Sequence, residues 1–353
     1  MKKRILLLCL ALSLLPLALW GCGGKESDVH VFYYTYSDTY ISTVRTELDK
    51  KLEGAGLSYQ DYDAAGNQTT QTEQIRTAIT KGAKTILVNI VNTGSDDAAN
   101  EIVKLARDAG VSLIFFNREV SDDVIRSYEK CAYVGTRAVE AGILQGEMIG
   151  EYLTANFERV DLNKDGRISY ILFKGEEGNN EAIYRTKYSV EGANAALTAA
   201  GKPSLAFYDP GNPNGYLVDQ NGQWSAAAAN DYMTTALASH NAGANNMIEL
   251  VICNNDAMAE GAISALNAAG YNTGNENFIP VFGVDATEAA KSLIKAKKMT
   301  GTVMQDAAGM ADALLKLTQN TLAQGGKPMD HTEGLTVDED VSKVRIAYGK
   351  YLG

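Results

Sequence analysis

Five polar side chains recur at the same point of a repeating pattern, directly after a short apolar run. They are Asp38, Asn117, Asn255, Asp285 and Gln305. Carboxylates accept several hydroxyl protons, and amides both donate and accept. In open α/β sheets the ligand crevice lies outside the carboxyl ends of the strands. Each residue taken alone could equally cap the next helix, but together they predict a cleft that recognises a ligand with many hydroxyl groups.

A second set of oxygen-bearing residues has the spacing of a calcium loop. At EF-hand positions 1, 3, 5, 7 and 9 the ligands would be Asp161, Asn163, Asp165, the Arg167 carbonyl and Ser169. Gly166 stands at position 6, where the loop turns sharply. Leu172 stands at position 12, where the motif requires glutamate, so the ordinary pattern fails. Either a distant residue closes the shell, or the segment is a metal-free turn, since Asp, Asn and Gly favour turns.

The N-terminus has the composition of an export signal. Basic residues at positions 2–4 precede the apolar run Ile5–Leu19, which is shorter than the roughly 20 residues that a membrane-spanning helix needs. The run ends in Leu-Trp-Gly-Cys, similar to a lipobox, and predicts lipidation at Cys22. The alternative is a plain secretory signal with an incidental cysteine. We expect a signal peptide at 1–21, a linker at 22–27 and an extracytoplasmic protein tethered to the membrane by lipid alone.

Composition argues against a nucleic-acid partner. The 353 residues carry a formal net charge of −11 with only three histidines, and the charge becomes about −14 without the three basic residues of the signal. The remaining cysteines, Cys131 and Cys253, lie in apolar surroundings typical of small buried hydrophobes, and a disulfide between them is not predicted. Length and hydrophobic content fit two domains.

Short apolar runs alternate with amphipathic segments along the chain. The predicted strands are His30–Tyr36, Tyr59–Tyr62, Thr85–Val91, Ser112–Asn117, Ser169–Lys174, Leu205–Tyr208, Ile248–Asn254, Ile279–Val284 and Gly301–Met304. Helical spacing marks Tyr40–Leu52, Gln68–Lys81 and Asp96–Ala109, and Ala-rich helices separate the later strands. Such alternation predicts an α/β protein with two doubly wound, parallel-sheet lobes.

Several blocks, in order, carry a family resemblance. They are Tyr36-Ser-Asp-Thr-Tyr40, Phe115-Phe-Asn-Arg-Glu119, Asp161-Leu-Asn-Lys-Asp-Gly166, Asn254-Asn-Asp-Ala-Met-Ala259, Val281-Phe-Gly-Val-Asp-Ala286 and Gly301-Thr-Val-Met-Gln-Asp306. On these blocks the chain resembles the galactose/glucose-binding proteins of the ribose-type substrate-binding family of ABC transporters. The resemblance implies the type I periplasmic binding protein fold, with three hinge crossings. The lobes would be 28–137 with 305–343, and 138–304 with 344–353.

The resemblance also implies a set of sugar-binding residues. Asp38, Asn117, Arg185, Asn255 and Asp285 match the polar ligands of the family, and Tyr40 and Trp224 stand where aromatic plates face the sugar ring. The alternative for both aromatic residues is a role in the core. Three further positions differ, since Asn179, Glu181 and Gln305 replace His, Asp and Asn. A monosaccharide remains the expected ligand, galactose or glucose with methyl-galactoside as a further candidate, and these replacements leave its identity open.

The resemblance further implies that Glu249 closes the calcium loop, so that structural Ca2+ joins two parts of one lobe. Ser169 is shorter than the Gln found in the family. The implied partners are the monosaccharide and the permease of an ABC transporter, and the implied state is a monomer. A receptor for another sugar and a receptor that reports to a chemotaxis sensor are alternatives. An enzyme is not expected, because the sequence has no G-x-S-x-G elbow, phosphate loop or histidine metal site.

Overall fold

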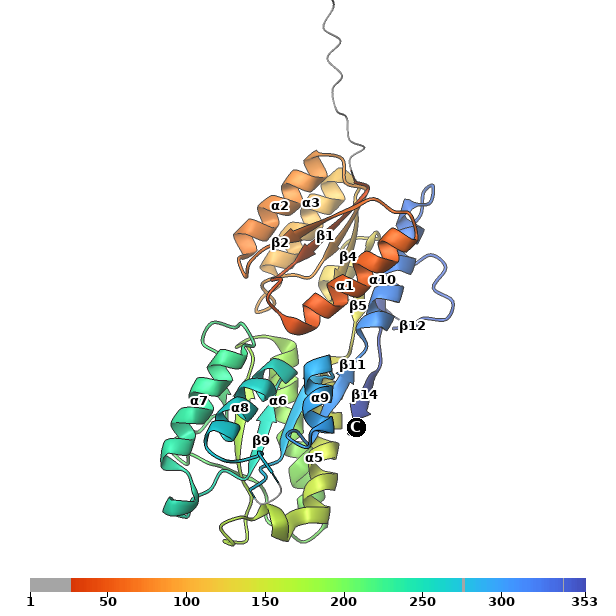
Figure 1. The fold of residues 1–353 in the computed structure, drawn as a ribbon. Coiled ribbons are helices and arrows are strands. Elements are labelled where there is room, and N and C mark those ends of the chain that lie inside the picture. The colour runs from red at the N-terminus through yellow and green to blue at the C-terminus, as the bar shows by residue number, and fades with distance from the viewer. Residues whose placement is uncertain (1–26, 275–276, 339) are drawn as a thin grey trace, which may run out of the picture.

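The computed structural model describes residues 27–274, 277–338 and 340–353, which form two lobes, each built on a seven-stranded sheet (Figure 1). The predicted signal peptide and Cys22 lie outside the described residues. The first sheet has the order β12-β13-β5-β4-β3-β1-β2. Its strands are β1 (Val29–Tyr33), β2 (Tyr59–Asp63), β3 (Thr85–Val88), β4 (Ser112–Phe116), β5 (Cys131–Gly135), β12 (Thr336–Val337) and β13 (Lys343–Arg345). Its helices are α1 (Thr39–Gly54), α2 (Gln68–Thr80), α3 (Asp97–Ala109), α4 (Asp122–Arg126) and α10 (Ala307–Leu322).

The second sheet has the order β14-β11-β10-β9-β6-β7, with β8 paired to β6. Its strands are β6 (Ser169–Lys174), β7 (Ala206–Phe207), β8 (Leu217–Val218), β9 (Leu250–Cys253), β10 (Val281–Asp285), β11 (Gly301–Gln305) and β14 (Tyr348–Tyr351). Its helices are α5 (Ala138–Val160), α6 (Asn180–Ala199), α7 (Ala226–Ser239), α8 (Asp256–Ala268) and α9 (Glu288–Lys295), with a short 3₁₀ turn at Ala242–Ala244.

Helices cover both faces of each sheet because the strands are apolar on both faces. In β1, Val31 packs with α1 and α10, and the next residue, Phe32, packs with α2 and α3. In β6, Phe173 faces α7 and α8, whereas Leu172 faces α5 and α6. This arrangement confirms the predicted two-lobed, doubly wound fold. The outermost pairs β12–β13 and β11–β14 are antiparallel and depart from the parallel pattern.

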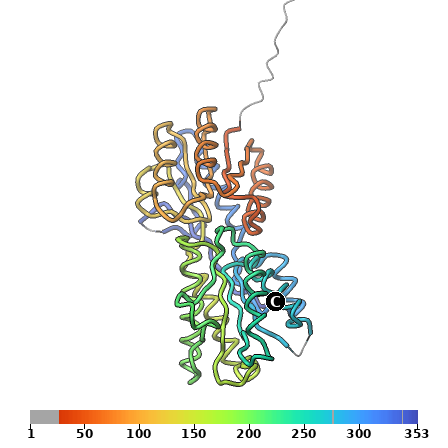
Figure 2. Tube along the Cα trace, turned by 90° about the vertical axis from the view of Figure 1, so that its left-hand side faces the viewer, coloured from red at the N-terminus to blue at the C-terminus, as the bar shows by residue number. Residues whose placement is uncertain are grey.

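The chain crosses between the lobes three times, after β5, after β11 and after β13, so that α10 from late in the chain lies beside α1 (Figures 1 and 2). Two lobe boundaries differ slightly from those predicted. Gln305 pairs with Tyr348 in the second sheet, so the crossing follows residue 305. Val344 and Arg345 pair with β5, so they belong to the first lobe. In both places strand pairing continues past the predicted boundary.

Two predicted strands end early, since β1 ends before Tyr36 and β3 ends at Val88 rather than at Val91. The strand β1 ends at Tyr33 because the next amide, that of Tyr34, donates to the side chain of Asn89 (3.3 Å) rather than to a strand.

Cys131 and Cys253 are buried and unpaired, as predicted. Within the part of the chain that the structure describes, no helix is both long and apolar enough to cross a membrane.

Candidate functional site

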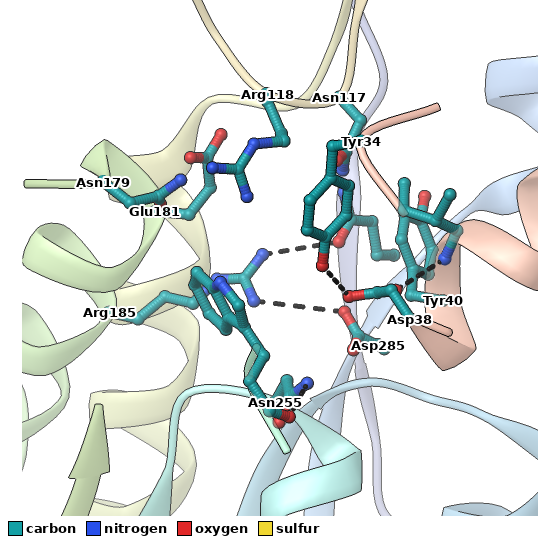
Figure 3. A pocket seen from close by; sticks show the side chains of 13 residues that line it. Tyr34, Asp38, Tyr40, Asn117, Arg118, Asn179, Glu181, Arg185, Asn255 and Asp285 are labelled. Atoms are coloured by element: carbon teal, nitrogen blue, oxygen red, sulfur yellow. Dashed lines mark hydrogen bonds and ion pairs between the residues drawn. The ribbon is translucent and has the colours of Figure 1, made fainter. Parts of the chain in front are cut away.

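One polar pocket lies between the lobes at the carboxyl ends of both sheets (Figure 3). All ten side chains that the sequence predicts for the site line it: Asp38, Tyr40, Asn117, Asn179, Glu181, Arg185, Trp224, Asn255, Asp285 and Gln305. The fold gathers them because parallel strands present their carboxyl ends at one edge of the sheet. Tyr34, Ile41 and Arg118 also line the pocket and are not among the predicted residues.

Three of the predicted residues cap helices as well as lining the pocket. Asp38 accepts from the Ile41 amide at the start of α1 (2.7 Å), and Asn179 and Asn255 cap α6 and α8 in the same way. The cap uses one side-chain oxygen and leaves the other polar atom for a second partner. In Asp38 that second oxygen accepts from the Tyr34 hydroxyl (2.6 Å). In Asn179 and Asn255 the side-chain nitrogen likewise has a protein partner, since it donates to the Thr93 hydroxyl and to the Trp224 carbonyl.

Arg185 lies at the centre of the pocket wall of the second lobe. Its guanidinium donates to the Asn254 carbonyl (2.8 Å), the Tyr348 hydroxyl (3.2 Å) and Gln305 Oε1 (3.4 Å). Asp285 Oδ1 lies 4.0 Å from Arg185 Nη1. Burial raises the pKa of Asp285 well above its ordinary value, and Arg185 opposes that shift. The site thus keeps a buried carboxyl group beside a fixed cation.

Trp224 forms one flat wall of the pocket. Its indole lies against Gly175, where an added Cβ would come within 2.1 Å of the ring. Its Nε1 donates to Glu176 (3.3 Å), and its carbonyl accepts from Nδ2 of the Asn255 side chain (3.1 Å). The ring is held from behind and at its edge, so the aromatic plate needs a residue without a side chain at position 175.

Six buried polar atoms around the pocket have no hydrogen-bond partner. They are Tyr40 Oη, Arg118 Nε, both carboxylate oxygens of Glu181, Arg185 Nε and Gln305 Nε2. Buried polar groups in folded proteins are nearly always paired, and an unpaired group costs about 1–3 kcal/mol. Unpartnered donors and acceptors on side chains that line the same pocket favour a ligand that both donates and accepts, as a compound with several hydroxyl groups does.

Arg118 and Tyr34 were not predicted from the sequence as site residues. Arg118 is 5 % exposed, and its Nη2 bridges the Val91 carbonyl and Glu176 Oε2, both at 2.8 Å. Its guanidinium carbon also lies 4.5 Å from the centre of the Tyr34 ring. The available signal was a charged residue directly after Asn117 at the end of an apolar strand.

In the predicted calcium loop, backbone amides donate to the carboxylates of Asp161 and Glu249. Asp161 accepts from the amides of Asp165 (3.1 Å) and Gly166 (2.9 Å), as in a tight loop. Glu249 lies against the loop, where its carboxylate accepts from the amides of Leu162 (2.7 Å) and Ser169 (3.0 Å). In the described ranges 27–274, 277–338 and 340–353, no three His, Cys, Asp or Glu side chains gather as a metal cluster.

The donors of the loop suit calcium by their chemistry. Carboxylate, amide and carbonyl oxygens are the ligands that Ca2+ prefers, and burial raises the pKa of Glu249 to about 7, so a cation nearby would favour its charged form. The Ser169 hydroxyl donates to the carbonyl of Met247, and its role as a ligand stays a prediction. Asp161, Asn163, Asp165 and Glu249 are therefore the residues that fit the ion best.

Two parallel α/β lobes with a polar pocket between them, joined by three crossings, define a hinged ligand receptor. Residues 29–327 match the family described as periplasmic binding protein domain, and the chain belongs to that family. Family membership places the protein outside the cytoplasm.

Individual relatives cover nearly the whole chain. A D-galactose/methyl-galactoside binding periplasmic protein of Haemophilus influenzae is 34 % identical over 349 residues, covering 99 % of this chain and 96 % of that protein. A D-xylose-binding periplasmic protein of Escherichia coli is 26 % identical and covers 94 % of this chain and 87 % of its own length. A Clostridium phytofermentans ABC transporter solute-binding protein solved with β-D-glucose superposes with a TM-score of 0.70 at 20 % identity, covering 92 % of this chain and 93 % of that one. This last likeness concerns the fold.

Proposed function

We propose that the protein is the substrate-binding component of an ABC importer, which captures a monosaccharide and delivers it to the permease. The observation that carries the proposal is the presence of six buried, unpartnered polar atoms on side chains that line one pocket between the lobes. Trp224 and Tyr40 add aromatic surfaces for the C–H faces of a sugar ring. The relatives named for galactose and xylose support the same class of ligand.

Galactose and glucose are the proposed ligands, with methyl-galactoside as a further candidate. The test is calorimetric titration of the purified protein with galactose, glucose, methyl-galactoside, xylose and ribose. Tight binding of a hexose with one site per chain supports the proposal. No heat with any of these sugars would refute it. Recovery of the bound sugar unchanged after prolonged incubation would support binding without conversion, whereas release of a new product would favour a carbohydrate-active enzyme.

We further propose that Ca2+ binds the loop at Asp161, Asn163, Asp165 and Glu249 in a structural role. Contact between the distant Glu249 and the loop supports this proposal. The protein freed of metal should take up one calcium ion per chain, and Asp161→Asn should abolish that uptake. Unchanged calorimetric traces with and without calcium would leave a metal-free turn as the explanation of the segment.

Two further proposals concern the setting of the protein in the cell. Cys22 carries the lipid anchor, so Cys22→Ser should move the protein from the membrane fraction to the soluble fraction. The protein acts as a monomer, which light scattering can test. A role in chemotaxis is the alternative output of the same receptor. Sugar-directed swimming that persists after deletion of the permease would favour that alternative.

A further inference from the structure

The connection between β10 and α9 has an unusual backbone at the edge of the pocket. Asp285, the last residue of β10, lines the pocket, and Ala286 and Thr287 lead from it to the helix (Figure 3). Asp285 has φ of 124° and Ala286 has φ of 55°, which are values that residues other than glycine rarely adopt. Such a backbone persists only where its surroundings hold it. The direction of the Asp285 carboxylate therefore depends on the groups that hold this connection.

A second buried carboxylate holds the connection at two amides. It belongs to Asp256, the first residue of α8, which is 0 % exposed and lies outside the set of residues that line the pocket. Asp256 Oδ2 accepts from the Thr287 amide (2.8 Å). Its Oδ1 accepts from the Thr302 hydroxyl (2.7 Å), and the oxygen of that hydroxyl accepts from the Ala286 amide (3.3 Å). Both carboxylate oxygens thus fix the two residues that follow Asp285.

The fold makes room for the Asp256 carboxylate although burying it is unfavourable. The groups that donate to it are neutral, and burial raises its pKa to about 7. A carboxyl group buried among neutral donors costs folding free energy when it is charged. At Gly283, two residues before Asp285, an added Cβ would come within 2.3 Å of Asp256 Oδ1. The strand therefore leaves out a side chain to admit a group that stability alone does not require.

We propose that Asp256 and Thr302 are positioning residues for the ligand, which hold the connection after β10 so that the Asp285 carboxylate points at a sugar hydroxyl. This inference rests on the proposed sugar-binding function. Both residues act on the sugar through Asp285 and do not touch it. Their loss should therefore weaken binding only while Asp285 carries a carboxylate.

The test is a double-mutant cycle between Thr302 and Asp285. Thr302→Val keeps the shape of the side chain and removes the hydroxyl, and Thr302→Ser restores the hydroxyl. Asp285→Gly removes the carboxylate and adopts positive φ without strain. Titration followed by indole fluorescence measures the affinity of each variant for galactose, glucose and methyl-galactoside, alone and in combination, and the difference between the two backgrounds gives the coupling.

Thr302→Val should weaken the best-bound sugar by roughly 10- to 100-fold, as expected when a charge-assisted hydrogen bond is lost. Thr302→Ser should bind within about threefold of the wild type. In the Asp285→Gly background, Thr302→Val should change affinity less than about twofold. Asp256→Asn, which keeps one acceptor oxygen, should show the same dependence on Asp285, and it carries the test if Thr302→Val does not fold. Equal losses in both backgrounds, or no loss in either, would overturn the inference.

Asn272→Ala is the matched control for loss of stability. Asn272 is 2 % exposed, and its Nδ2 donates to the carbonyls of Ile279 (2.8 Å) and Lys298 (3.0 Å), before β10 begins and thus at the opposite end of that strand from Asp285. Asn272→Ala should lower Tm and leave affinity within about twofold. A loss of affinity as large as that of Thr302→Val would also overturn the inference. Absence of binding by the wild type to all three sugars would instead refute the proposed function itself.

Discussion

Replacing Asp285 with asparagine should weaken sugar binding without lowering the stability of the sugar-free protein. Asp285 is 6 % exposed, and its nearest cation, Arg185, lies 4.0 Å away. Its backbone has φ of 124°, a region that residues other than glycine rarely adopt. Burial without a close ion pair raises the pKa of this carboxyl, so its charged form destabilises the unliganded protein.

The expected magnitudes follow from these contacts. A carboxylate that accepts two sugar hydroxyls contributes about 1.5–3 kcal/mol for each charge-assisted bond, so Asp285→Asn should weaken binding by roughly 100- to 10,000-fold. The unliganded variant should be at least as stable as the wild type. Because the folded-state pKa lies above the unfolded one, the wild type loses stability as pH rises between those two values, and the variant does not. The advantage of the variant should therefore be larger at pH 8 than at pH 5.

Calorimetric titration and thermal unfolding of the sugar-free protein at both pH values give the two readouts. Asp231→Asn, at an exposed position on α7, is the matched control and should leave both unchanged. A variant that loses affinity together with several degrees of Tm at pH 8 would show that Asp285 supports the fold rather than the ligand. Less than a tenfold loss of affinity would refute its assignment as a principal contact.

Three other perturbations have defined outcomes. Chelation of calcium should lower Tm more at pH 8 than at pH 5.5, because Glu249, whose pKa burial raises to about 7, must be ionised to bind the ion; equal shifts at both pH values would contradict this. Gly175→Ala should displace the Trp224 ring and weaken sugar binding at least tenfold, as measured by titration and by indole fluorescence; unchanged affinity would show that the ring does not contact the sugar. Tyr40→Phe should raise the Tm of the sugar-free protein, since it removes a buried hydroxyl that has no partner there, while lowering affinity by about fivefold; a lower Tm without an affinity change would assign Tyr40 to the core.

Much of the pocket could be predicted because strand ends are a local signal. An apolar run followed by a polar residue is visible in the sequence, and parallel pairing brings such ends to one edge. The strand β10 is an example, since the predicted run Ile279–Val284 followed by Asp285 forms a strand over Val281–Asp285, with Asp285 at its carboxyl end. Cross-lobe contacts have no local signal. Arg118 is held at the pocket by a hydrogen bond to Glu176, which is 58 residues away along the chain and in the other lobe.

The hinge strands were harder to predict than the central ones. Thr336–Val337 and Lys343–Arg345 are too short and too polar to show alternation, and their pairing depends on β5, which lies about 200 residues earlier. The charge on Lys343 is stabilised by Glu119 (2.8 Å) and Asp122 (2.7 Å) of the first lobe. Such an ion pair cannot be predicted from the sequence alone, because it forms between residues more than 200 positions apart that only the fold brings together.

Closure and recognition share the same side chains in this protein. Trp224 donates to Glu176, Glu176 accepts from Arg118, Arg118 lies over Tyr34, and Tyr34 donates to Asp38. A ligand that contacts members of this chain in both lobes stabilises the closed arrangement by its differential affinity alone. Weakening the Arg118–Glu176 pair therefore changes the population of closed molecules, and the apparent affinity for every ligand falls by that same fraction. Selectivity among sugars, by contrast, depends on the atoms that the chain leaves free.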